Sequence, residues 1–328
     1  MMNMSDTPST SRRWTVACAG AALVLAATAC SDSSEADDGP TDETTTLVVG
    51  ITPIIDHASV FIAIEEGFFD EEGLSVSAQP VQGGAAAVPA MVSDDLQAAF
   101  ASYPSFFLAE SQYIGVTIVA EGVRGTEETA GIYVNDDSPI EAPEDLEGRT
   151  IAVNTLNNIG DVSIAASLEE QGVETAGIEF VEYPFPDMVP ALEQDAVDAV
   201  WLVEPFRSGA EEDGARKVFS SYTGIAEGIP VSGIGMADEF VAANPTTVEG
   251  FTRAIERANG MLAEDPAIAA EIVQTYSETT EEQAEAMELP VWTEGAVDVD
   301  ELGRWNDLLL ATGVLHEPIE MSELTLQD

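Results

Sequence analysis

The sequence predicts an α/β protein built from two similar lobes, each a mainly parallel sheet flanked by helices. The chain has 328 residues, enough for two lobes of roughly 100 to 200 residues each. From Leu47 onward, short apolar runs alternate with helical patterns, which is typical of strand–helix–strand units with parallel strands. One such unit occurs twice: GLSVSAQPV leads to AAAVPAMVSDDLQAAFAS, and GIEFVEYPF leads to DMVPALEQDAVDAVWLVEP.

Short runs of β-branched and apolar residues predict the strands, and amphipathic patterns between them predict the helices. The predicted strands are 47–52, 74–81, 97–101, 116–120, 130–134, 150–153, 178–183, 196–202 and 216–219. The predicted helices among them are 59–66, 86–93, 104–112, 161–171 and 187–194. After Ser232 the pattern is mostly helical, over 245–263, 266–276, 280–287 and 298–312. Pro245 and Pro266 stand where proline is tolerated, at helix starts.

We expect the chain to leave the first lobe and return to it. Residues 47–130 and 233–328 are predicted to form lobe 1, and 131–232 to form lobe 2. Ser232 marks the expected return, where a hinge and a binding site often coincide.

Residues 1–29 have the features of an export signal. Arg12 and Arg13 precede an apolar run that is too short to span a membrane. The run closes on Ala-Thr-Ala-Cys30, which resembles a bacterial lipobox although Ala27 stands where leucine is usual. We therefore expect a lipid on Cys30, an acidic tether over 30–46 and a membrane-anchored protein on the extracytoplasmic face. General secretion and twin-arginine export both stay open.

The charge of the chain excludes several partners. Sixty-one acids against ten bases give a net charge of −51, and removal of residues 1–29 leaves −52. Such a surface disfavours nucleic acids and anionic lipid surfaces, and it fits saline or alkaline surroundings. Cys30 is the only cysteine beyond the signal, so the folded body has neither a disulfide nor a thiol nucleophile.

Four segments carry a resemblance to a known family. They are 57–63 (HASVFIA), 66–74 (EGFFDEEGL), 145–153 (DLEGRTIAV) and 197–205 (VDAVWLVEP). In order and spacing they resemble the periplasmic-type substrate-binding proteins of the nitrate, sulfonate, taurine and thiamine-precursor transporters. The resemblance implies a two-lobed periplasmic-binding-protein-like fold of type II. It also implies a ligand cleft between the lobes and delivery of a small solute to an ABC permease and its ATPase.

Ligands of parallel sheets bind at the carboxyl ends of strands, where helices present free N–H groups. In lobe 1 the residues at such ends include a helix cap, paired glycines and an aromatic ring. These candidates are His57, Ser59, Gly83, Gly84, Ser102 and Tyr103. In lobe 2 they include three asparagines suited to a polar solute, an aromatic wall and a carboxylate for a ligand amine. These candidates are Asn154, Asn157, Asn158, Trp201, Glu204 and Phe206, together with Ser232 at the return.

The nature of the ligand stays open at this point. A helix N-terminus, or Arg124 or Arg207, would suit an anion such as a sulfonate or nitrate. Glu204 would suit the amine of a zwitterion such as taurine, and the aromatic residues Phe61, Tyr103, Trp201 and Phe206 would suit a pyrimidine precursor of thiamine. We expect a small organic anion or zwitterion.

An enzyme on the same fold is the main alternative, and a surface sensor or adhesin is another. The sequence lacks Gly-x-Ser-x-Gly and a phosphate-binding Gly-Lys-Ser/Thr loop, and its two histidines, His57 and His316, are too few for a histidine-rich metal centre. We expect a monomeric binding protein without a metal or cofactor.

Overall fold

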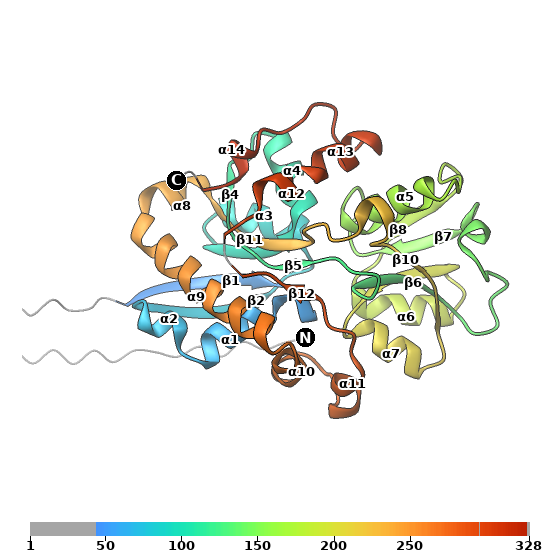
Figure 1. The fold of residues 1–328 in the computed structure, drawn as a ribbon, viewed down its shortest axis with the longest axis horizontal. Coiled ribbons are helices and arrows are strands. Elements are labelled where there is room, and N and C mark those ends of the chain that lie inside the picture. Colours follow the sequence, from blue (N-terminus) through green and yellow to red (C-terminus); the bar gives the residue numbers. More distant parts are fainter. Residues whose placement is uncertain (1–43, 295, 327–328) are drawn as a thin grey trace, which may run out of the picture. The chain divides into compact units, whose positions relative to one another are not determined.

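The computed structural model describes residues 44–294 and 296–326, which contain two five-stranded sheets (Figure 1). The order in the first sheet is β2 (Leu74–Pro80), β1 (Thr45–Ile51), β3 (Ala98–Ser102), β11 (Ser232–Ala237) and β4 (Val116–Glu121). The order in the second is β8 (Glu179–Glu182), β7 (Thr150–Val153), β9 (Ala199–Val203), β6 (Ala130–Val134) and β10 (Arg216–Ser220). We call each sheet with the helices packed on it lobe 1 and lobe 2. The short strands β5 (Val123–Arg124) and β12 (Val291–Trp292) pair beside them.

The two sheets have the same plan, as the repeated sequence pattern predicts. In each, the first three strands are parallel, the fourth is antiparallel, and the fifth pairs antiparallel with the fourth. The repeated unit is β2–α3–β3 in lobe 1 and β8–α6–β9 in lobe 2. Its helices are α3 (Gly84–Val92) and α6 (Phe185–Glu193), and each contains an internal proline.

The antiparallel strands β6 and β11 arise from the crossovers between lobes. Each enters its sheet from the other lobe and therefore begins at the edge where the parallel strands end. Ser232, the first residue of β11, pairs with Ser102, the last residue of β3. Ala130, the first residue of β6, pairs with Val203, the last residue of β9. The carboxyl ends of the parallel strands thus lie at the junction of the lobes.

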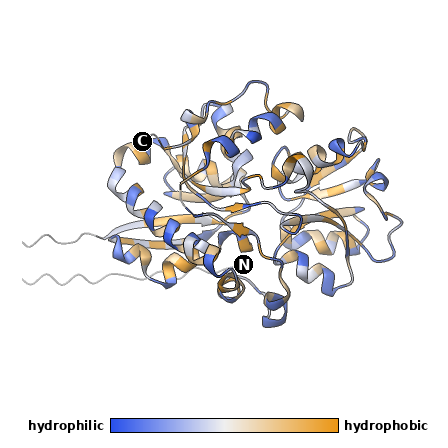
Figure 2. Cartoon of the chain, viewed as in Figure 1, coloured by the Kyte–Doolittle hydropathy of each residue, from blue (hydrophilic) through white to orange (hydrophobic). Residues whose placement is uncertain are grey.

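The long helix α9 (Pro245–Glu264) shows why the chain returns to lobe 1. Its apolar residues recur at helical spacing, and Val248, Phe251, Ile255 and Leu262 are all buried. Figure 2 shows this alternation of hydrophobic and hydrophilic residues along the helix. The buried face packs on α1 (Ala58–Glu65) and α2 (Phe68–Glu71), where Phe251 stacks on Phe69 with ring centroids 5.1 Å apart.

The remaining helices cover the sheets and the junction. They are α4 (Tyr103–Ser111), α5 (Ile159–Glu170), α7 (Phe206–Glu212), α8 (Asp238–Ala243), α10 (Ala267–Ile272), α11 (Glu281–Ala286), α12 (Val299–Leu302), α13 (Arg304–Ala311) and α14 (Met321–Leu324). The C-terminal helices contact both lobes, since α13 packs against α4 and α5, and α11 packs against α7. No helix of residues 44–294 and 296–326 has the length and apolar character that crossing a membrane requires.

The structure differs from the predicted elements mainly after residue 232. The strand β11 is absent from the predicted elements, because its sequence SGIGMA contains two glycines, which have little strand propensity. Gly235 is needed there, because a Cβ on it would lie 2.5 Å from the ring of Phe106. The predicted helix 298–312 is divided at Gly303 into α12 and α13.

The predicted signal 1–29 and the lipidation site Cys30 lie outside the described residues. Of the predicted tether 30–46, only the end is described, and β1 begins there at Thr45.

Candidate functional site

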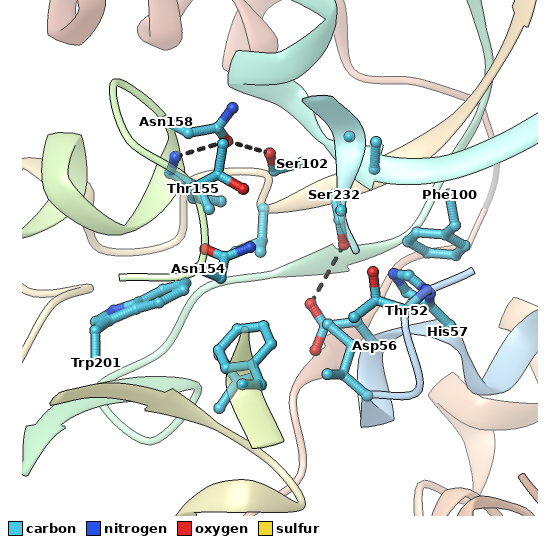
Figure 3. A pocket seen from close by; sticks show the side chains of 18 of the residues that line it. Thr52, Asp56, His57, Phe100, Ser102, Asn154, Thr155, Asn158, Trp201 and Ser232 are labelled. Atoms are coloured by element: carbon cyan, nitrogen blue, oxygen red, sulfur yellow. Dashed lines mark hydrogen bonds between the residues drawn. The ribbon is translucent and has the colours of Figure 1, made fainter. Parts of the chain in front are cut away.

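A cavity of about 50 Å³ lies at the junction of the lobes and is lined by residues of both (Figure 3). The sequence-predicted candidates that line it are His57, Gly83, Gly84, Ser102, Asn154, Asn158, Trp201 and Ser232. One water molecule takes up about 10–15 Å³ of cavity volume measured in this way. The cavity therefore has room for only a small solute.

Ser102 and Asn158 join the lobes across one side of this cavity. The Ser102 hydroxyl donates to Asn158 Oδ1 at 2.6 Å. Asn158 Nδ2 donates to Ser105 Oγ at 3.1 Å, and Asn158 Oδ1 also accepts the backbone N–H of Ile159 at 2.8 Å. Asn158 is therefore both the N-cap of α5 and a polar contact between the lobes.

Three helices begin at this same side, which favours negative charge. α3 begins at Gly84, α4 at Tyr103 and α5 at Ile159, and Gly84, Ser102, Asn158 and Ile159 line the cavity. Gly84 leaves no room for a side chain, because a Cβ would overlap Ser105 Oγ. The start of α3 has no side-chain cap, and its N–H groups and helix dipole attract an anion without a basic residue, whereas the Ile159 N–H at the start of α5 is already bound to Asn158 Oδ1.

Asp56 lies on the opposite side of the cavity, next to His57 (Figure 3). Its side chain is buried, and Oδ2 accepts the Ser232 hydroxyl at 3.4 Å. Oδ1 has no hydrogen-bond partner in another described residue. Burial raises the pKa of Asp56 from 3.8 to about 6, against a smaller lowering by Ser232. Asp56 therefore presents to the cavity a carboxyl group whose burial is only partly offset by donors of the protein.

His57 is held as a neutral ring. Its Nδ1 accepts the backbone N–H of Thr52 at 3.0 Å, so Nε2 carries the proton. The ring stacks on Phe100 with centroids 4.0 Å apart. Burial lowers the pKa of His57 to about 3, which excludes it as a cation for a ligand anion at neutral pH.

Aromatic residues of lobe 2 also line the cavity. Trp201 is buried, its Nε1–H donates to Ser221 Oγ at 3.0 Å, and its ring lies 5.9 Å from that of Phe185. Phe185 and Tyr222 also line the cavity. With its N–H satisfied, Trp201 presents only its ring to a ligand.

Comparison with known proteins places this fold in a family. The family model described as NMT1/THI5 like matches residues 54–269. The chain belongs to the NMT1/THI5-like family. A curated relative, the taurine-binding periplasmic protein of Escherichia coli (strain K12), is 24% identical over 189 residues. The match covers 57% of this chain and 57% of that relative, so it spans little more than half of the relative's length.

Solved structures share the fold of this NMT1/THI5-like chain. The alkanesulfonate-binding protein SsuA from Xanthomonas axonopodis pv. citri, bound to MOPS, has a TM-score of 0.72 at 15% identity, covering 87% of this chain and 99% of that one. The periplasmic nitrate-binding protein NrtA from Synechocystis PCC 6803 has a TM-score of 0.71 at 16% identity, covering 86% of each chain. The predicted periplasmic-binding-protein-like fold class is confirmed.

Five of the candidates in this NMT1/THI5-like chain lie away from the cavity lining: Ser59, Tyr103, Asn157, Glu204 and Phe206. Ser59 is buried inside α1, and Tyr103 lies against Gly233 of β11. Asn157 is exposed, with a left-handed φ of 54°. Phe206 stacks on the outer side of Phe185, with centroids 5.4 Å apart.

Glu204 is buried but fully engaged within the protein. Its carboxylate accepts the N–H and hydroxyl of Ser208 at 3.1 and 2.9 Å, and the N–H of Glu288 at 3.3 Å. Arg207 Nε lies 3.8 Å from it. Burial raises the pKa of Glu204, and these donors and Arg207 oppose that rise. Glu204 fixes the start of α7 to the C-terminal segment.

The two candidate arginines are also used within the protein. Arg124 pairs with Glu121 at 3.1 Å and Asp298 at 3.3 Å. Arg207 pairs with Glu128 at 3.1 Å and with Glu211 at 3.4 Å. Of the described residues that line the cavity, none is an arginine or a lysine. The aromatic candidate Phe61 stacks on Tyr276 at 3.8 Å, also away from the cavity lining.

Sequence reasoning missed Asp56, Thr52, Thr155, Phe185 and Tyr222 as lining residues. Asp56 had a usable signal, since it directly precedes His57 in the loop after the first strand. The abundance of acids in the chain hid it. Tyr222 follows an antiparallel strand, and the rule of strand carboxyl ends in parallel sheets does not point to it.

Proposed function

We propose that this chain is an extracytoplasmic solute-binding protein that captures a small organic anion or zwitterion and delivers it to an ABC importer. The observation that carries the proposal is the cavity at the junction of two matched sheets, with lining residues from both lobes. A solute in such a cavity bridges the lobes and favours their closed arrangement over an open one.

The polar groups of the cavity suit a ligand with an anionic group. The start of α3, which has no side-chain cap, supplies backbone N–H groups to such a group, and the Ser102 hydroxyl can turn to it from Asn158 Oδ1. The chain would thus hold an anion by local dipoles, in spite of its net charge of −51. The names of the similar proteins, which refer to taurine, alkanesulfonates and nitrate, agree with this ligand class.

The contacts in the cavity favour binding over catalysis. The Ser102 hydroxyl donates to an amide oxygen, which does not act as a base. The Nδ1 atom of His57 is occupied by a backbone N–H, and its ring is fixed on Phe100. We therefore expect a ligand to bind without turnover.

A thermal-shift panel of taurine, alkanesulfonates, nitrate and pyrimidines tests this function. We expect at least one small anion or zwitterion to raise the melting temperature of the purified protein, and Asn158→Ala to reduce that rise strongly. Asn157→Ala is the matched control, because Asn157 is exposed beside the same helix start. A panel without any shift, or equal loss in both variants, contradicts the proposal.

We further propose that the protein is held at the membrane by a lipid on Cys30. The support is the sequence from Ala27 to Cys30, with the acidic segment that follows it. Cys30→Ser should release the protein from the membrane fraction and abolish labelling with radioactive palmitate. Labelling that persists in the variant contradicts the lipid anchor.

A further inference from the structure

Three buried oxygen atoms around the cavity have no hydrogen-bond partner in another described residue. They are Asp56 Oδ1, Tyr222 Oη and Asn154 Oδ1, and all three residues line the cavity. Buried polar groups without a partner are rare in folded proteins, because each has lost its hydrogen bonds to water. Three of them around one small cavity are acceptors that a ligand with donor groups would satisfy on binding.

The chemistry of these atoms indicates what the ligand carries. An ionised carboxylate accepts hydrogen bonds only, and an amide oxygen does the same. Tyr222 keeps its phenolic proton, because burial first and the nearby Asp56 second raise its pKa, but its oxygen also accepts. A primary ammonium offers three N–H donors and a positive charge. It would donate to Asp56 Oδ1 and Tyr222 Oη and neutralise Asp56.

The other side of the cavity has the opposite preference. This side contains Ser102, Asn158 and the starts of α3 and α5. Figure 3 shows Ser102 and Asn158 apart from Asp56, with Asn154 between the two sides. That side favours negative charge through helix dipoles, whereas Asp56 repels it. A simple anion that fills the cavity would be repelled by Asp56 at the opposite side of the cavity.

We propose that the ligand is a small zwitterion whose primary ammonium is bound by Asp56 and Tyr222 and whose anionic group faces Ser102 and the helix starts. The inference rests on the proposed function and narrows its ligand class. It also moves the amine contact from Glu204, the sequence-based candidate, to Asp56. Glu204 already accepts three hydrogen bonds from the protein and does not line the cavity.

Calorimetric titration with two matched pairs of ligands tests the inference. Taurine is compared with isethionate, and β-alanine with 3-hydroxypropanoate, because in each pair a hydroxyl replaces the ammonium. We expect the native protein to bind the ammonium member of the better pair at least tenfold more tightly. Asp56→Asn should reduce this preference to threefold or less while the hydroxyl member still binds, which shows that the variant is folded. Asp70→Asn is the control, since Asp70 is exposed on α2.

The outcomes separate this inference from the proposed function. Equal binding of both members by the native protein overturns the ammonium contact and leaves the binding function intact. A preference that survives in Asp56→Asn overturns the role of Asp56. Absence of binding for both pairs, together with an unresponsive thermal-shift panel, overturns the proposed function and the inference with it. The native preference requires no variant, so a poorly folded Asp56→Asn leaves the test decisive.

Discussion

Asp56 and Glu204 are two buried carboxylates in neighbouring loops, and they differ in what surrounds them. The loops touch, since the Ile55 N–H donates to the backbone oxygen of Glu204 at 3.1 Å. The exposed fraction is 3% for Asp56 and 1% for Glu204. Glu204 accepts three hydrogen bonds from the chain, whereas Asp56 accepts one long hydrogen bond and faces a cavity.

The difference shows that burial alone does not mark a binding carboxylate. A buried carboxylate that accepts hydrogen bonds from the protein stabilises the fold. A buried carboxylate with an unused oxygen can accept a hydrogen bond from a ligand. Substitutions at the two positions should therefore separate stability from binding.

The largest expected difference is in affinity for an ammonium-bearing ligand. Asp56→Asn should weaken that affinity by roughly a hundredfold or more, because it removes the charge partner in a desolvated site. Glu204→Gln should change it by less than about threefold. Calorimetric titration of both variants checks this, and a larger loss in Glu204→Gln would reverse the assigned roles.

Truncation of Glu204 should act on stability instead. Glu204→Ala leaves the donors of Ser208 and Glu288 unpaired and removes one acid beside buried Arg207. We expect the free energy of unfolding to fall by about 3 kcal/mol. Urea unfolding measures it, and a loss below about 1 kcal/mol would show that Glu204 is not an organising residue.

Asp56 should make the unliganded protein less stable as pH rises. The pKa of Asp56 is about 6 in the folded protein, above the ordinary value of 3.8. As the pH rises, Asp56 therefore loses its proton at a lower pH in the unfolded chain than in the folded protein. The contribution of Asp56 to stability should therefore fall between about pH 4 and pH 6. Tyr222 and Tyr276, on which the Asp56 charge acts, keep their protons in this range because burial raises their pKa.

Asp56→Asn should remove this loss. Above pH 6 the variant should exceed the native protein in unfolding free energy by about 2 kcal/mol, and near pH 4 by little. Urea unfolding at several pH values measures the difference between the two proteins, which cancels the effect of the other acids. A difference that is constant with pH would contradict the raised pKa of Asp56.

The contact between the lobes should have the smallest effect. Ser102→Ala removes the hydroxyl that donates to Asn158 and should weaken ligand binding by roughly fivefold, or about 1 kcal/mol. Ser111→Ala is the matched control, because Ser111 is exposed and bonds only within α4. Equal effects of the two variants would show that the Ser102–Asn158 contact contributes nothing to binding.

The sequence predicted the fold better than it predicted the site. Alternating strands and helices, and the repeated Val-Pro-Ala unit, define the two matched sheets because period and spacing determine which elements form. Ser102 and Asn158 were selected because strand ends meet at one edge. The sequence could not distinguish Asn157 from Asn158, which were both candidates with the same side chain. In the structure Asn158 lines the cavity, and Asn157, with its left-handed φ, is exposed.

The two carboxylates show a second limit of the sequence. Glu204 stood out because it follows the conspicuous strand ending in Trp-Leu-Val, but its hydrogen bonds come partly from Glu288, 84 residues later. Asp56 is buried like Glu204 and differs from it in being left without such donors. Which donors reach a carboxylate is decided by tertiary packing, and local sequence does not record it.

A crystal structure of the protein with its tightest-binding ligand tests the central claim most directly. We expect the ligand in the cavity between the lobes, with a ligand nitrogen at a hydrogen-bonding distance of about 2.7–3.2 Å from Asp56 Oδ1. Its anionic group should lie beside Ser102 and Gly84. A ligand bound outside this cavity, or one that places its anionic group against Asp56, would contradict the account.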